Sequence, residues 1–105
     1  MKPSVPYLPF LHQRLRDPEY ALGYLNACLD DDDESVFLLA LKDVATAHGG
    51  LAKLAKKAKM NREHLFRMLS KRGNPEMRSL QKIAGAFGWK IEFVEKKDSK
   101  LKKAA

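Results

Sequence analysis

The chain has 105 residues, of which 45% are hydrophobic and 31% are charged, which predicts one globular domain with a modest core rather than a disordered chain. A single cysteine, Cys28, excludes an intrachain disulfide, and no apolar run approaches the roughly 18 residues of a membrane span. Because the start of the sequence has no signal-peptide pattern, a soluble, cytoplasmic protein is expected.

The net charge of +7 is unevenly distributed along the chain. Residues 17–34 contain seven acidic side chains and no basic one, whereas residues 50–78 contain nine basic and two acidic side chains. A basic block of this kind suits a polyanionic partner. The separate acidic block argues against general adhesion to anions.

Residues 1–16 are predicted to form an extended N-terminal arm. Pro3, Pro6 and Pro9 follow one another at three-residue intervals, which favours extended or polyproline II backbone. The domain that follows, residues 17–96, is expected to be all-α with about five helices. Residues 97–105 are expected to form a basic, flexible tail.

The first two expected helices are marked by their caps. Asp17 can cap a helix in which Pro18 takes the first position. The run Asp30 to Asp33 suits a loop, because carboxylates oppose the negative end of a helix dipole, and its last member can cap a second helix over about 34–48. Two glycines at 49–50 are expected to end that helix with positive φ.

Two short helical patterns follow, over 51–58 and about 62–70, with the spacing of a helix-turn-helix. The small side chain of Ala55 permits the two helices to approach, and Leu65 and Met68 are expected to face inward. Asn61 can cap the second helix. Asn74 and the proline after it are expected to cap and open a further helix that ends at residue 88.

With its apolar residues inward, the second of these helices can enter a major groove. Arginine can read guanine, glutamate can accept from cytosine, and an apolar side chain can meet a thymine methyl. The expected base contacts are Arg62, Glu63, Phe66 and Arg67. The expected phosphate contacts are Gly50, Leu51, Lys53, Lys56, Lys57, His64, Lys71, Arg72 and Asn74.

These assignments leave alternatives open. The arginines at 62 and 67 suit phosphate about as well as bases, and Glu63 can instead pair with Lys59 or Arg67. The basic block can also be a solvated helix face, although the inward apolar set makes this the weaker interpretation.

The sequence "WKIEFVE", residues 89–95, alternates apolar and polar side chains, which predicts a β-strand. A single strand exposes unpaired backbone groups and needs a partner. Pairing across the two-fold axis of a homodimer is therefore expected, with Trp89, Ile91 and Phe93 at the contact.

Catalytic and metal chemistry is not expected. The sequence shows no paired carboxylates in an apolar setting, no nucleophile with a base and no phosphate-cradling glycine loop. His12, His48 and His64 lie far apart and lack ligands at metal-binding spacing, and the aspartate run lacks the pattern of a calcium loop. Neither an enzyme nor a cofactor is predicted.

Residues 16–94 resemble the HigA-like addiction-module antidote family, within the lambda-repressor-like XRE/Cro helix-turn-helix regulators. The resemblance rests on the paired glycines at 49–50, on the closing "WKIEF" segment and on a pattern formed by Leu65, Arg67, Leu69, Ser70, Gly73, Asn74 and Pro75. Two positions depart from the family. Lys59 stands where glycine is common in the turn, and Phe66 stands where a polar residue or tyrosine is more frequent.

The resemblance implies a lambda-repressor-like bundle that acts as an antitoxin. Such proteins neutralise a neighbouring toxin, usually of the RelE/ParE type, and bind double-stranded operator DNA as dimers to repress their own operon. Because RNA-cutting toxins are basic, the acidic region is the expected toxin contact, through Asp17, Tyr20, Tyr24, Asp30 and Asp31. A DNA-binding regulator without a toxin is the alternative, and an RNA-binding protein is a weaker one.

Overall fold

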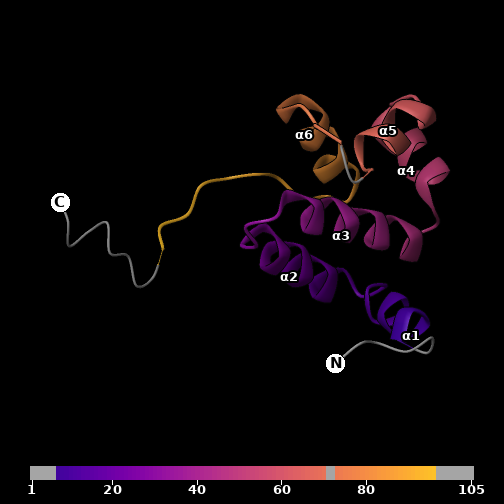
Figure 1. Cartoon of the computed structure of the whole chain (residues 1–105). Helices are drawn as coiled ribbons and strands as arrows, with labels where there is room; N and C mark the ends of the chain where they lie inside the picture. The colour runs from indigo at the N-terminus through magenta and orange to yellow at the C-terminus, as the bar shows by residue number, and fades with distance from the viewer. Residues whose placement is uncertain (1–6, 71–72, 97–105) are drawn as a thin grey trace.

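The computed structural model of the chain describes residues 7–70 and 73–96, which form six α-helices (Figure 1). The first three are α1 (Tyr7–Arg14), α2 (Pro18–Leu29) and α3 (Glu34–Ala47). The last three are α4 (Leu51–Ala58), α5 (Arg62–Met68) and α6 (Met77–Ala86). The predicted all-α class is confirmed, with one helix more than expected.

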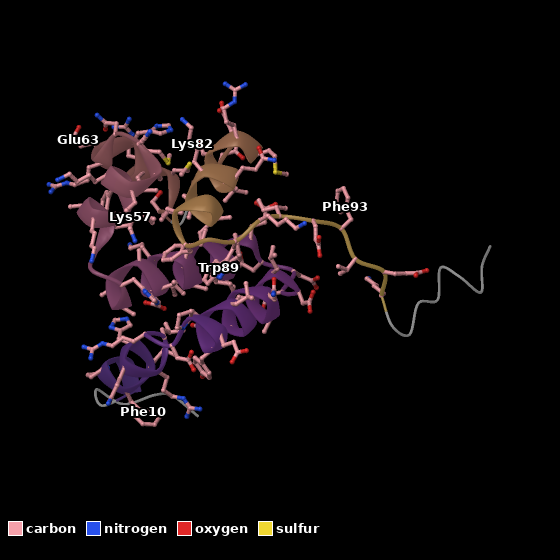
Figure 2. All side chains as sticks on the ribbon, turned by 180° about the vertical axis from the view of Figure 1, so that it is seen from behind. Phe10, Lys57, Glu63, Lys82, Trp89 and Phe93 are labelled. Atoms are coloured by element: carbon pink, nitrogen blue, oxygen red, sulfur yellow. The ribbon has the colours of Figure 1, made fainter. Side chains whose placement is uncertain are left out.

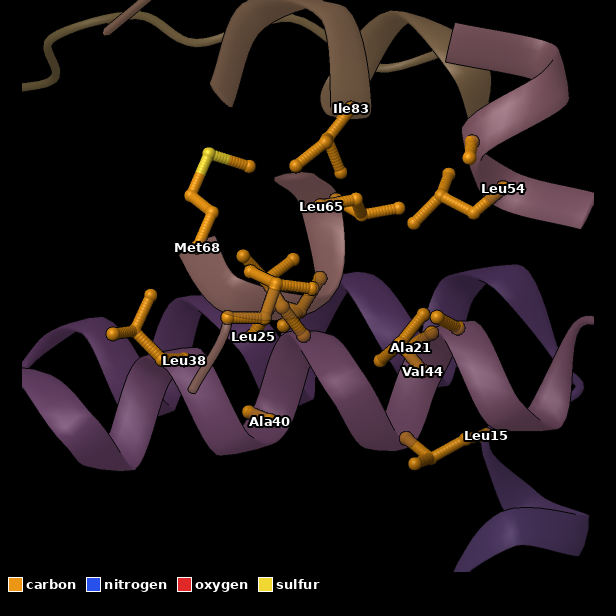
Figure 3. Packing of buried hydrophobic residues seen from close by; sticks show 14 of the residues in the cluster. Leu15, Ala21, Leu25, Leu38, Ala40, Val44, Leu54, Leu65, Met68 and Ile83 are labelled. Atoms are coloured by element: carbon orange, nitrogen blue, oxygen red, sulfur yellow. The ribbon is translucent and has the colours of Figure 1, made fainter. Parts of the chain in front are cut away.

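The longest helix, α3, lies at the centre of the bundle. It packs against α1 and α2 on one side and against α4 on the other, and α4 in turn contacts α5 and α6 (Figure 1). Every helix contributes to one apolar cluster around α3, part of which is seen in Figure 3. The largest side chains that are almost fully buried are Leu15, Val44, Leu65, Leu69 and Ile83.

Three of the predicted helix caps are confirmed. The Asp17 carboxylate accepts a hydrogen bond from the Glu19 N–H at 3.1 Å, and Asp33 accepts one from the Ser35 N–H at 2.9 Å. The Asn61 side chain accepts from the His64 N–H, also at 2.9 Å. Each cap pairs one of the N–H groups that a helix start leaves without an intrahelical acceptor.

The predicted start of α6 at Asn74 and Pro75 is wrong. After α5, the Gly73 N–H donates to the Ser70 carbonyl at 2.8 Å. A Cβ atom on Gly73 would overlap the Met68 carbonyl oxygen, so only glycine fits this approach. Glu76 is still extended, and α6 can begin only after it.

The predicted extended arm is wrong for residues 7–14, which form α1. Pro9 is the third residue of this helix, where a missing N–H removes no intrahelical hydrogen bond. Leu11 and Leu15, four residues apart, bury their side chains in the common core. This burial makes α1 part of the fold, while residues 1–6 lie outside the described residues.

The predicted strand over residues 89–95 is also wrong, since the described part of the chain contains helices and irregular backbone only. Trp89 is occupied within the chain: its N–H donates to the Ala84 carbonyl at 2.8 Å and its ring stacks on Phe87 at 4.9 Å. Ile91 and Phe93 are exposed. Alternation supplies the side chains of a strand but not its hydrogen-bonding partner, so the fold gives no support to strand pairing across a dimer.

Three helices end with the same hydrogen bond and a residue of positive φ. After α3, α4 and α6, an N–H bonds to the carbonyl five residues earlier: Gly50 to Ala45, Met60 to Ala55 and Trp89 to Ala84. Gly49 and Gly88 provide the positive φ in two cases, but Lys59 provides it after α4, with φ 57° and ψ 49°. A side chain in this conformation costs about 1–2 kcal/mol. The turn therefore keeps its expected shape without the glycine common in the family that the sequence resembles.

No helix within the described ranges combines the length and the apolarity needed to cross a bilayer. The predicted basic tail, residues 97–105, lies outside the described residues.

Candidate nucleic-acid interface

The predicted helix-turn-helix falls on helices α4 and α5, which pack against each other and are joined by residues 59–61. Leu54, Ala55 and Ala58 bury one face of α4, and Leu65 and Met68 bury one face of α5. The small side chain at position 55 permits this approach, as the sequence predicted. Because Leu65 has no exposed surface at all, the rotation of α5 about its axis is fixed by the core.

The opposite face of α5 points away from the bundle. Its exposed side chains are the four expected base contacts, which the structure brings together along one side of the helix: Arg62, Glu63, Phe66 and Arg67. With Leu51 and Ala52 of α4 they line an open hollow of about 570 Å³. Figure 2 shows Glu63 at the outer edge of the bundle, far from Phe10 of α1.

Lys42 of α3 reaches this face as well. Its ammonium nitrogen lies 5.3 Å from the centroid of the Phe66 ring, within the range of a cation–π contact. Lys42 could not be predicted from the sequence, because this residue lies outside the basic block and is brought to α5 only by the packing of α3. Phe66 itself keeps 54% of its surface exposed.

The start of α4 adjoins the hollow. Gly50 is the N-cap and has no side chain that could cap the helix, so the first backbone N–H groups of α4 can donate hydrogen bonds to an anion. Leu51, predicted with Gly50 as a phosphate contact, lines the hollow directly. A phosphate at this end of α4 would lie beside the exposed face of α5.

The lysines of α4 fall on two sides of the helix. Successive residues are about 100° apart, which places Lys56 near Ala52 and the hollow but turns Lys53 and Lys57 away from it. Lys53 and Lys57 line a second hollow, of about 210 Å³, with His48, Phe87 and Trp89. The predicted phosphate contacts are therefore not all brought to one surface.

The remaining predicted phosphate contacts are scattered. His64 is exposed on the flank of α5, and Asn74 is exposed in the link before α6. Lys71 and Arg72 lie outside the described residues.

Two of the three histidines are engaged in tertiary contacts. His48 Nε2 lies 2.7 Å from the Leu15 carbonyl oxygen, which can only accept, so this nitrogen carries the proton. The His48 ring also meets the ring of Phe87 edge-on, which ties the end of α3 to the ends of α1 and α6. His12 lies 3.3 Å from the Asp43 carboxylate. Within residues 7–70 and 73–96, no three His, Cys, Asp or Glu side chains gather as a metal site would require.

The expected toxin contacts lie at the N-cap of α2, on this helix and just after it, and α3 separates α2 from α5 (Figure 1). Several already have local contacts: Asp17 caps α2, Asp31 accepts from the Asp33 N–H at 2.8 Å, and the Tyr20 ring lies 4.7 Å from the Arg14 guanidinium. Tyr24 packs against the core, and Asp30 is exposed. The acidic side chains at and after α2 are therefore held by the fold, on the side of the bundle away from the arginines of α5.

Cys28, at the C-terminal end of α2, is half-buried. Burial raises the pKa of its thiol, and the carboxylates of Asp31 and Asp43 raise it further, against a hydrogen bond with Tyr24 that lowers it. A thiol held neutral in this way is a poor nucleophile.

Comparison with known proteins identifies a family. A family model described as a probable addiction module antidote protein matches residues 10–95, which is most of the chain. An uncharacterised protein of Haemophilus influenzae is 31% identical over 80 residues, which cover 76% of this chain and 81% of that protein. No solved structure matches. The chain belongs to the family of probable addiction module antidote proteins.

Proposed function

We propose that the chain is an antitoxin that binds duplex DNA through α4 and α5 and binds a toxin through another surface. Membership of an addiction-module antidote family supports the antitoxin role. One observation carries the DNA-binding role: the buried Leu65 and Met68 fix α5 so that two arginines, a glutamate and a phenylalanine face outward together. This is the arrangement by which a recognition helix presents side chains to base edges.

In the proposed complex, α5 enters the major groove and α4 lies across the DNA backbone. Arg62 and Arg67 read bases or hold phosphates at the groove edge, and the uncapped start of α4 holds a phosphate. Repression of the chain's own operon and membership of the HigA-like branch of helix-turn-helix regulators are part of the same proposal. The proposal assigns the chain no catalytic step.

Replacing Arg67 tests the reading helix. Arg67→Ala is expected to weaken binding to the DNA upstream of the chain's own gene by about 1–3 kcal/mol and to relax its sequence preference, because an outward arginine of α5 is lost. Fluorescence anisotropy with specific and scrambled duplexes measures both effects. Arg16→Ala removes the same charge from the link between α1 and α2 and is the matched control. Equal losses of affinity in the two variants would mean that binding depends on the net charge of the chain and not on the side chains of α5.

A toxin partner is proposed on the acidic side of the bundle, with a basic RNA-cutting protein of the RelE/ParE type as the expected class. Asp17, Tyr20, Tyr24, Asp30 and Asp31 are the proposed contacts. The carboxylates of Asp17, Asp31 and Asp33 also accept local hydrogen bonds, so they are poor choices for a charge reversal.

The double variant Asp30→Lys with Asp32→Lys changes the charge of this surface without removing those hydrogen bonds. It is expected to weaken a complex with the protein encoded beside this chain at least tenfold. The reason is that two negative charges at the contact become two positive charges, a change of four units. Isothermal titration calorimetry measures the affinity, with Glu76→Lys and Glu92→Lys as the control pair. If the affinity of the complex did not change, the loop that contains Asp30 and Asp32 would not be part of the toxin contact.

The homodimer also stays a prediction. Since Trp89 stacks on Phe87 within the chain, the predicted contacts that stay exposed for a dimer are Ile91 and Phe93. Ile91→Ser with Phe93→Ser is expected to convert a dimer to a monomer in light scattering, because the contact loses its apolar side chains. Lys90→Ser with Val94→Ser is the control, and a dimer that survives the first pair would place the contact elsewhere.

A further inference from the structure

Phe66 is the exposed aromatic residue at the centre of the proposed DNA-binding face. Its neighbour in sequence, Leu65, is fully buried, so the core holds the Phe66 ring outward and no small rotation of α5 could bury it. A phenylalanine left half-exposed forgoes about half of the roughly 1.5–3 kcal/mol that full burial of such a side chain contributes. The ring shares its hollow with Leu51 and Ala52, so it belongs to an apolar area with a rim of charged residues, as binding surfaces often have.

Charged side chains surround this ring. Arg62, Glu63 and Arg67 share the hollow with it, and the Lys42 ammonium lies over the ring. The surroundings are therefore mainly basic, which suits a polyanion, but the ring itself can form no hydrogen bond. In a duplex polyanion, whose bases are already stacked, the ring gains most from an apolar group.

Duplex DNA offers one such group to a helix in its major groove, the 5-methyl group of a pyrimidine. Residues 62 and 66 are one helical turn apart, and residue 67 follows directly, so an arginine stands on either side of the ring. An arginine beside the methyl-reading residue can reach O6 and N7 of a neighbouring guanine.

We propose that Phe66 determines specificity by reading the 5-methyl group of a pyrimidine that lies next to a guanine read by Arg62 or Arg67. This inference rests on the proposed binding of duplex DNA. The shared chemistry is a 5-methylpyrimidine, supplied by thymine or by 5-methylcytosine. Lys42 is a positioning residue, which holds the ring through the cation–π contact.

The experiment begins with sequences selected by the full chain from a random duplex pool. Each thymine of the selected half-site is then replaced by deoxyuridine, which removes the methyl group and leaves base pairing intact. One position is expected to lose about fourfold in affinity, the effect of one buried methyl group. Cytosine and 5-methylcytosine at that position separate the two sources: the methyl group on cytosine is expected to recover binding relative to cytosine itself.

Phe66→Ala is expected to bind thymine and deoxyuridine duplexes with equal affinity, whereas Phe66→Leu keeps part of the discrimination because it keeps an apolar side chain. Thermal unfolding of both variants confirms that the fold is intact, since residue 66 lies outside the core. Failure of the wild-type chain to bind any duplex would overturn the proposed DNA binding as a whole. Duplex binding without a deoxyuridine-sensitive position, or a sensitivity that Phe66→Ala retains, would overturn this inference alone, as would a Phe66→Ala variant that loses only toxin binding.

Discussion

Leu65→Ala is expected to lower the free energy of unfolding by about 2–5 kcal/mol, the usual cost of truncating a fully buried leucine. The side chain has no exposed surface and lies in the cluster that joins α5 to the rest of the bundle (Figure 3). Such a cost is a large fraction of the total stability of a small domain. Urea unfolding followed by circular dichroism measures it.

The adjacent residue gives a matched control. Phe66→Ala removes a larger side chain from the same helix, but this side chain is 54% exposed, so the expected loss is below about 1 kcal/mol. If the two variants lost equal stability, the orientation of α5 described above would be wrong, and with it the set of outward residues.

Leu15→Ala is expected to cost a similar amount, about 2–5 kcal/mol, because Leu15 is fully buried at the end of α1. Its carbonyl also accepts the hydrogen bond from His48, which the substitution leaves in place. Gln13→Ala, at an exposed position of the same helix, is the control, and the same unfolding measurement applies. A negligible effect of Leu15→Ala would mean that the segment is the loose arm that its prolines suggested.

Local chemistry made much of the fold predictable. Asp17, Asp33 and Asn61 each precede a helix and cap it through a hydrogen bond that spans two or three residues. The positive φ at Gly49 and Lys59 belongs to turns that end a helix, and these turns also involve only neighbouring residues. Such signals lie within a few residues and need no tertiary information.

The errors have two physical origins. In α1, prolines suggested extended backbone, but Pro9 falls in the first turn, and the burial of Leu11 and Leu15 against distant helices outweighs the local preference. At residues 89–95, alternation indicated a strand, but a strand exists only where another backbone pairs with it. Both outcomes depend on contacts between residues far apart in the sequence.

In the candidate site, too, features set by the local sequence could be predicted and features set by tertiary contacts could not. The outward set on α5 could be predicted because the helical period and the apolar positions fix it. The contribution of Lys42 could not, since α3 places it beside Phe66 across a tertiary contact. That Lys53 and Lys57 face Phe87 and Trp89 could not be predicted either, because it depends on where α6 ends in the fold.

The arrangement of the bundle keeps the two proposed surfaces apart. α3 lies between α2, which carries the acidic surface, and α5, which carries the basic one (Figure 1). A toxin on the acidic surface and a duplex on α5 would therefore not compete for the same side chains. Under the proposal, one chain therefore holds a toxin and a duplex on separate surfaces.

DNA binding by α4 and α5 is tested by a nuclear magnetic resonance titration of the ¹⁵N-labelled chain with duplex DNA from upstream of its own gene. The largest amide shift changes are expected at residues 50–53 and 61–67, the start of α4 and the reading helix, while α1 and α2 change little. Large changes confined to α1 and α2, with α5 unaffected by a duplex that binds, would contradict this mode of binding.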